Sequence, residues 1–227
     1  MMYDMLFTPL TLRGVTFKNR IVMPALTLFY SGDRKLNDRY MRFWERRAEG
    51  GAGAIVVGPT GIDMVGSGFM TLGLDSDEGV DDFAELARRL HAHDCKAIAQ
   101  LFHSGRYAMS MLTGEKPIAP SAVTSDFSKE TPREMTMEDI QRVQDAFVQA
   151  ARRAREAGLD GVEIIASAGY LISQFLSPVT NLRDDEYGGS FEERTRFDRE
   201  VVEKVRAQVG EDFLVTVRVA GNDFVEG

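Results

Sequence analysis

Apolar positions along the chain alternate between short runs of strand length and longer runs at helical spacing, with turn residues between them. The short runs predict five strands, at residues 21–24, 54–57, 97–101, 162–165 and 213–219. The longer runs predict a helix between each pair of consecutive strands. Because strands and helices alternate, we expect the strands to pair in parallel through right-handed crossovers.

Each predicted helix has one apolar face, and several have a signal at an end. The first helix is predicted near Asn37 to Gly50 and is ended by Gly50-Gly51, and Gly158 ends the third. Capping boxes at Thr136 with Asp139 and at Ser190 with Glu193 predict the starts of the third and fourth helices. In chain order, the apolar faces are Tyr40, Phe43 and Trp44; Phe83, Leu86, Ala87 and Leu90; Ile140, Val143, Phe147, Ala150 and Ala154; and Phe197, Val201, Val205 and Val209.

The long polar loops all follow strands, at residues 25–36, 58–79, 102–135 and 166–189, whereas the helix-to-strand turns are short. This pattern puts function at the carboxyl ends of the strands, where (β/α)8 barrels have their active sites. An open doubly wound sheet would also have its site there, so both folds remain open on this argument.

Five strands are too few to close a barrel of eight. We therefore predict an α/β fold consisting of a TIM (β/α)8 barrel truncated after about strand 5, as a single domain over residues 1–227. Residues 6–17 predict an N-terminal β-hairpin that turns at Arg13-Gly14 and could close the other end of the barrel.

Composition narrows the function classes. The chain has 227 residues, 44% hydrophobic and 27% charged, which is typical of a globular protein. Its net charge of -8, with basic residues interspersed among acids, argues against nucleic-acid binding. No apolar run approaches the roughly 18 residues of a membrane-spanning helix, and the N-terminus lacks a secretory signal. We therefore expect a cytoplasmic enzyme.

Cysteine and histidine usage predicts no metal site. Cys95 is the only cysteine, so no intrachain disulfide can form, and we expect it to be a small buried thiol ahead of a strand. The three histidines are well separated, which gives no metal-ligand spacing.

Several polar side chains stand at predicted strand ends. Thr27 follows the first strand, Gln100 closes the third, Tyr170 follows the fourth and Arg218 lies in the fifth. Gln100 could bond the edge of a planar heterocycle in both directions, and Arg218 could stabilise negative charge on it. A phenol that is protonated at neutral pH makes Tyr170 a natural proton donor. Alternatively, Gln100 and Arg218 are satisfied inside the barrel, with Glu163 as the partner of Arg218, and Tyr170 only packs.

Residues 169–190 form a loop of about twenty residues, which is uncommon in a compact domain unless it is functional. Together with LFTPL at 6–10, KNRIVM at 18–23, QLFHSGRY at 100–107, IAPS at 118–121 and AGLDGVE at 157–163, it resembles the old yellow enzyme family of NADH:flavin oxidoreductases. The branch it most resembles contains bacterial 2,4-dienoyl-CoA reductase and the enoate reductases. The resemblance covers essentially the whole chain and corresponds to the N-terminal part of the family's barrel.

The resemblance implies a (β/α)8 barrel that holds FMN non-covalently. By position it assigns cofactor contacts to Pro24, Ala25, Leu26 and Thr27 after the first strand, Gly58 and Pro59 after the second, Gln100 in the third and Arg218 in the fifth. It implies that NADH or NADPH reduces FMN, and that flavin N5 passes hydride to an activated C=C bond of an unsaturated acid, ester or thioester. Tyr170 matches the family's proton donor, and Arg218 would stabilise the anionic reduced flavin.

The chain departs from the family pattern just before that tyrosine. Many members carry a histidine pair, or a histidine and an asparagine, where this chain has Ile165 and Ala168, and those side chains bond the substrate carbonyl. Losing such donors can cost on the order of 10²-fold in rate. His103 and Arg106 are two further candidates for substrate contact, and His103 could equally be structural.

Other features of the family lie outside these residues. The resemblance implies an FMN phosphate site on the last barrel strands, and a [4Fe-4S] cluster and an FAD domain only in a longer protein. We expect the chain alone to bind FMN poorly and, because its last strand leaves an open edge, either to be marginally folded or to associate, with a second copy or a complementing C-terminal chain as the candidate partners. Two alternatives are a non-catalytic or split barrel fragment, and a family dehydrogenase that runs the flavin step in reverse, as in amine demethylation.

Overall fold

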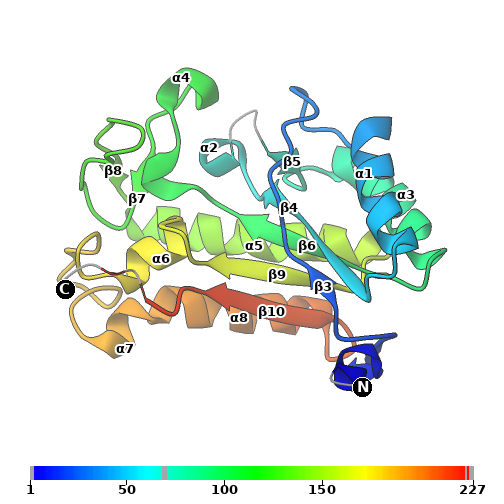
Figure 1. The fold of residues 1–227 in the computed structure, drawn as a ribbon. Coiled ribbons are helices and arrows are strands. Elements are labelled where there is room, and N and C mark those ends of the chain that lie inside the picture. The colour runs from blue at the N-terminus through cyan, green and yellow to red at the C-terminus, as the bar shows by residue number, and fades with distance from the viewer. Residues whose placement is uncertain (1–2, 68–70, 223, 225–227) are drawn as a thin grey trace.

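A computed structural model describes residues 3–67, 71–222 and 224; the other residues of the predicted 1–227 domain lie outside the described residues. At its centre is a parallel sheet in the order β10-β9-β6-β4-β3 (Figure 1). These strands are β3 (Val22–Met23), β4 (Ala54–Gly61), β6 (Lys96–Phe102), β9 (Gly161–Ala166) and β10 (Leu214–Val219), and the short β5 (Leu72–Gly73) pairs with the end of β4.

The order of the strands distinguishes between the two folds that the sequence left open. In the five-strand path, each strand pairs with the next one along the chain, all in parallel. A doubly wound sheet reverses its strand order at a switch point, and this path contains no reversal. The fold is therefore the predicted partial (β/α)8 barrel, an arc of consecutive strands with β3 and β10 at its edges.

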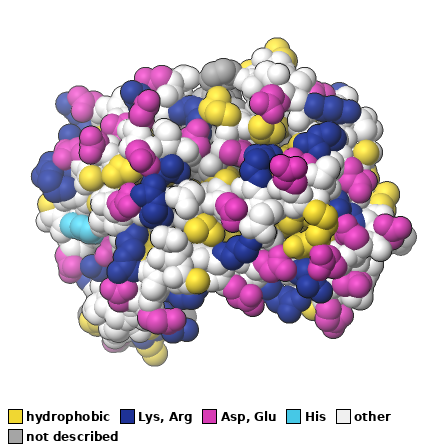
Figure 2. Space-filling view, turned by 180° about the vertical axis from the view of Figure 1, so that it is seen from behind, with side chains coloured by type: hydrophobic (Ala, Val, Ile, Leu, Met, Phe, Trp, Pro, Cys, Tyr) yellow, Lys and Arg dark blue, Asp and Glu magenta, His cyan; other side chains and the backbone are white. Residues whose placement is uncertain are grey.

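Four long helices cover the outer face of this arc (Figure 1). They are α1 (Asp38–Glu49), α3 (Val80–His91), α5 (Met137–Glu156) and α8 (Arg196–Val209). Their predicted apolar faces are largely buried, and Trp44, Phe83, Phe147 and Phe197 lie at the centre of the larger core. On the helical side, basic and acidic side chains are interspersed (Figure 2).

Of the two predicted capping boxes, one starts its helix where expected and the other does not. The Asn37 side chain accepts hydrogen bonds from the backbone N–H groups of the first turn of α1, and Thr136 with Asp139 forms the expected capping box of α5. The Ser190 and Glu193 box also forms, but it starts the single-turn α7 (Phe191–Arg194). Thr195 separates α7 from α8, so the signal marked a local turn ahead of the long helix.

The inner face of the arc has a second, smaller core. Ala54, Val56, Ile98 and Leu214 pack there against Val15 and Phe17. The latter two belong to a hairpin of β1 (Leu10–Leu12) and β2 (Val15–Phe17), whose turn at Arg13-Gly14 has positive φ at both residues. The hairpin therefore closes the amino end of the arc, as predicted, which leaves the carboxyl end open for a site.

The loops at the carboxyl end are built from short elements. They contain α2 (Met64–Ser67), η3 (Asp77–Gly79), η4 (Gly105–Tyr107), α4 (Ser110–Thr113), β7 (Ile118–Ala119) paired with β8 (Arg133–Glu134), and α6 (Leu171–Leu176), while η1 (Asp4–Phe7) precedes the hairpin. β4 also runs to Gly61, four residues past its predicted end, because pairing with β6 shifts register after Val57 and resumes at Thr60. Among the described residues, no helix is both long enough and apolar enough to cross a membrane.

Candidate active site

A cavity of about 540 Å³ lies at the carboxyl end of the sheet. It joins three residues that the sequence singled out, Thr27, Pro59 and Tyr170, which come from the loop after β3, from β4 and from the loop after β9. Five aromatic rings line it: Phe29, Phe102, Tyr107, Phe127 and Tyr170. The cavity is therefore an aromatic-walled site of a size typical for small-molecule ligands.

Tyr170 stands on one wall of this cavity, at the N-terminal end of α6. Its ring meets Phe102 edge-on at 4.5 Å and Tyr107 at 6.1 Å, measured between ring centroids. Burial, and to a lesser degree the nearby Tyr107, raises the pKa of Tyr170 above its ordinary value. Among the described residues none hydrogen-bonds the Tyr170 hydroxyl, so a protonated phenol is available to a ligand.

The backbone before Tyr170 is held by the loop that follows β6. Gly169 has a φ of +77°, and a Cβ at this position would collide with the Tyr107 hydroxyl. The Gln174 amide nitrogen donates to the carbonyls of Ser104 at 3.1 Å and Gly169 at 2.6 Å, and its oxygen accepts from the Arg106 backbone N–H. Gln174 thus joins the two loops that carry the phenols. Sequence reasoning missed it, and its only signal was a polar residue in an apolar helical turn.

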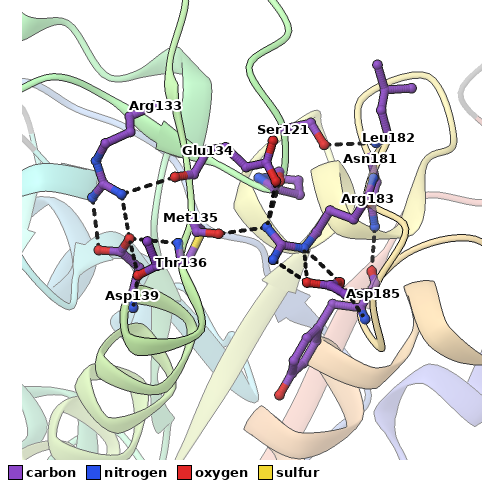
Figure 3. Close-up of polar contacts among 12 residues, drawn as sticks. Ser121, Arg133, Glu134, Met135, Thr136, Asp139, Asn181, Leu182, Arg183 and Asp185 are labelled. Carbon is purple, nitrogen blue, oxygen red and sulfur yellow. Dashed lines mark hydrogen bonds and ion pairs between the residues drawn. The ribbon is translucent and has the colours of Figure 1, made fainter.

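In the loop that follows β9, the polar residues beyond Tyr170 hold the loop itself in place (Figure 3). The guanidinium of the buried Arg183 donates to the carbonyls of Pro120 at 2.9 Å and Met135 at 2.7 Å, and it pairs with Asp185. The Arg183 guanidinium holds the pKa of Asp185 below its ordinary value. These residues are not part of the cavity wall. Of the loop that follows β9, only Tyr170 lines the cavity.

On the inner face of the sheet, Gln100 and Glu163 are paired neighbours on β6 and β9. The Gln100 amide nitrogen donates to Glu163 Oε1 at 2.7 Å. The partner expected for Glu163, Arg218, is exposed on the edge strand β10 and has no ion pair among the described residues. Glu163 faces Thr216 across β9 and β10 in register, and its carboxylate is already bonded to Gln100.

The remaining predicted cofactor contacts lie along two strand ends. Pro24 and Leu26 are exposed after β3, and Ala25 packs partly against the inner core. A Cβ on Gly58 would lie 3.0 Å from the Gln100 Cβ, so the glycine permits a close approach of β4 to Gln100.

The four predicted substrate contacts do not line the cavity. His103 is buried behind the wall, where its Nδ1 accepts from the Gly105 N–H and its Nε2 lies 3.5 Å from Asp63; burial lowers the His103 pKa. Arg106 donates to the Thr124 carbonyl at 3.3 Å. Ile165 is buried and Ala168 is exposed, and neither has a polar side chain.

Within the described part of the chain, no cluster of His, Cys, Asp and Glu side chains could hold a metal ion. Cys95 is the predicted buried thiol, directly before β6, and its burial raises the pKa to about 12.

Residues 5–227 match the model of the NADH:flavin oxidoreductase / NADH oxidase family. The chain is 48% identical over 224 residues to a metal reductase of Desulforamulus reducens, covering 99% of this chain and 34% of that protein. It is 39% identical to an NADPH dehydrogenase of Clostridium acetobutylicum, covering 98% of this chain and 66% of that one.

Among solved structures, a complex of 2-naphthoyl-CoA reductase with 2-naphthoyl-CoA superposes with a TM-score of 0.89 at 31% identity, covering 95% of this chain and 35% of that one. The chain thus spans between about a third and two thirds of the length of these proteins. The chain belongs to the NADH:flavin oxidoreductase family, also known as the old yellow enzyme family.

Proposed function

We propose that the chain provides the substrate wall and part of the flavin site of an oxidoreductase that reduces an activated C=C bond. When bound, FMN would supply the hydride chemistry, accepting hydride from NADH or NADPH and passing it to the alkene from N5. The observation that carries the proposal is Tyr170, a partly buried phenol on the wall of an apolar cavity at the strand ends, whose hydroxyl is bonded by none of the described residues.

The residues on the inner face fit a flavin. The Gln100 nitrogen is bonded to Glu163, and the Gln100 carbonyl oxygen receives no hydrogen bond from any described residue. This leaves an open acceptor for the imide N–H of a flavin pyrimidine edge, and the second amide hydrogen for a flavin carbonyl. Arg218 offers a guanidinium with no partner among the described residues, which suits the charge of a reduced flavin.

Tyr170 would donate its proton to the alkene carbon next to the activating group. Because burial raises its pKa, the phenol stays protonated through neutral pH and is ready to donate. The neighbouring ring faces of Phe102 and Tyr107 restrict its movement. Gln174 and Gly169 then hold the backbone from which the tyrosine projects.

The walls favour a large apolar substrate. The cavity of about 540 Å³ is lined mainly by aromatic and aliphatic side chains. Ile165 and Ala168 lie outside this lining and have no side-chain donor for a substrate carbonyl. We propose an unsaturated acid derivative, either an enoate or an enoyl thioester, whose tail lies against the aromatic rings. Tyr107 provides the second phenol of the same cavity.

The test is anaerobic reduction with NADH or NADPH in the presence of FMN, followed by addition of enoates and enoyl-CoA thioesters. Tyr170→Phe is expected to leave flavin reduction intact and to abolish alkene turnover. Tyr107→Phe is the matched variant, since it removes the other phenol from the same cavity. Unchanged turnover in Tyr170→Phe, or loss of turnover only in Tyr107→Phe, would overturn the assignment.

A second candidate function is supported by the edge of the arc. On β10, Val217 and Val219 are 38% and 61% exposed, and no described strand pairs beyond β10. An open apolar edge favours pairing with another strand. The chain would then act as one part of a split barrel, completed by a second copy or by a complementing chain, and catalysis would require both parts. To distinguish the two functions, the chain is mixed with a candidate partner and flavin binding is measured. Binding that increases on mixing supports the split barrel.

A further inference from the structure

Glu163 lies on the inner face of β9, directly across from Gln100 on β6 in the register of the sheet. Gln100 is only 3% exposed, and its amide nitrogen is 2.7 Å from Glu163 Oε1. On the β4 side there is no room for a side chain beside Gln100, since a Cβ on Gly58 would lie only 3.0 Å from the Gln100 Cβ. The side chain of Gln100 is therefore confined, and Glu163 is its hydrogen-bond partner.

The chemistry of this contact sets the direction of the amide. An ionised carboxylate only accepts hydrogen bonds, whereas an amide carries a donor end and an acceptor end of nearly equal shape. Glu163 can therefore bond only the nitrogen of Gln100, and the carbonyl oxygen must face elsewhere. No described residue donates to that oxygen.

We propose that Glu163 is a positioning residue that fixes the Gln100 amide with its carbonyl oxygen free to accept a hydrogen bond from a flavin imide N–H. The inference rests on the proposed function, because it concerns the side chain that would meet the flavin. Without the carboxylate, the amide could turn over and present its NH₂ group, and two donors would then oppose each other.

The groups around the carboxylate do not compete for this role. Thr216, the register neighbour of Glu163 on β10, donates its hydroxyl to the Val162 carbonyl at 3.3 Å. Arg218 is exposed on β10 and has no ion pair with any described residue. A hydrogen bond to a charged acceptor is roughly twice as strong as one between neutral groups, so this contact is strong enough to select one orientation.

The first test needs no flavin. In the ¹⁵N-labelled chain, the side-chain NH₂ signal of Gln100, assigned through Gln100→Glu, is expected to have one hydrogen shifted downfield, because that hydrogen is bonded to a carboxylate. This downfield shift should be reduced in Glu163→Gln. Glu203→Gln, which removes the same charge from the exposed outer side of α8, should leave it unchanged. A Gln100 signal that does not respond to Glu163→Gln would overturn the proposal.

The second test compares FMN with 3-methyl-FMN, in which a methyl group replaces the imide hydrogen, by quenching of flavin fluorescence. The wild-type chain is expected to prefer FMN by about fivefold or more, the usual value of one hydrogen bond, and Glu163→Gln should reduce this preference by at least about threefold. An equal preference in both proteins would refute the positioning role. If the Gln100 signal responds to Glu163→Gln but neither flavin binds, even at concentrations that would fill a weak site, the proposed function is refuted, and with it the part of this inference that concerns the ligand.

Discussion

Arg183 offers the sharpest test of how the loop is held in place. Its side chain is 5% exposed and donates to the carbonyls of Pro120 and Met135, which belong to the loop after β6, while it pairs with Asp185 in its own loop (Figure 3). Arg183→Met keeps an unbranched apolar chain and removes every one of these hydrogen bonds. The substitution therefore separates the charge and the hydrogen bonds from the packing.

The expected loss of stability in Arg183→Met follows from the groups that the substitution would leave unpaired. A buried carbonyl that loses its partner costs about 1–3 kcal/mol, and breaking a buried ion pair costs about 3–5 kcal/mol. The Asp185 side chain is 35% exposed and keeps access to water, which weakens the ionic part. We expect a loss of about 3–5 kcal/mol in the free energy of unfolding rather than the sum of all contributions.

The assay is urea unfolding followed by the fluorescence of Trp44, the single, fully buried tryptophan. Hydrogen exchange of the Leu182 amide, which donates to Ser121 at 2.9 Å, reports local opening of the loop. Arg13→Met is the control, because Arg13 is 64% exposed in a surface ion pair with Glu211, and little change is expected. A change below about 1 kcal/mol in Arg183→Met, with unchanged exchange at Leu182, would refute the reasoning.

Three further predictions concern a glycine, a helix cap and the open edge. Gly169→Ala should lower stability more than Gly114→Ala in urea unfolding, because both have a φ of +77° but only residue 169 meets the Tyr107 hydroxyl; equal losses would contradict this. Arg133 holds the pKa of Asp139 below its ordinary value, so the contribution of this ion pair to the free energy of unfolding is complete above about pH 4 and is lost as pH falls through the lowered pKa. In Asp139→Asn, the free energy of unfolding should therefore fall less steeply at acid pH. The chain should self-associate in sedimentation velocity and Val219→Lys should reduce this, whereas a stable, flavin-coloured wild-type monomer would refute it.

Local patterns predicted most of the framework. The predicted strands at 97–101 and 162–165 lie within β6 and β9, and Thr136 with Asp139 starts α5 where expected. These features depend on residues a few positions apart, so a single sequence contains the information. The Ser190 and Glu193 box shows the limit, since it forms as predicted but starts α7 instead of the long helix.

The candidate site was predictable in part, for a different reason. Residues that directly follow strands must lie at the carboxyl end of the sheet, and Thr27 and Tyr170 accordingly reach the cavity. Which polar groups pair with one another could not be predicted in this way. One alternative from the sequence paired Glu163 with Arg218, but Glu163 bonds Gln100, and His103 is buried behind the cavity wall.

The sequence by itself determined the alternation of strands and helices, the start of α5, the closing hairpin and the strand ends as the place for a site, because these follow from periodicity and local hydrogen bonding. Only the tertiary structure decided the strand order of the arc, the role of Arg183 and Asp185 inside the loop, and the contact of Gln174 with both phenol loops. The physical reason is that these depend on groups distant in the sequence that compete for the same few partners. The outcome of that competition is set by packing in three dimensions.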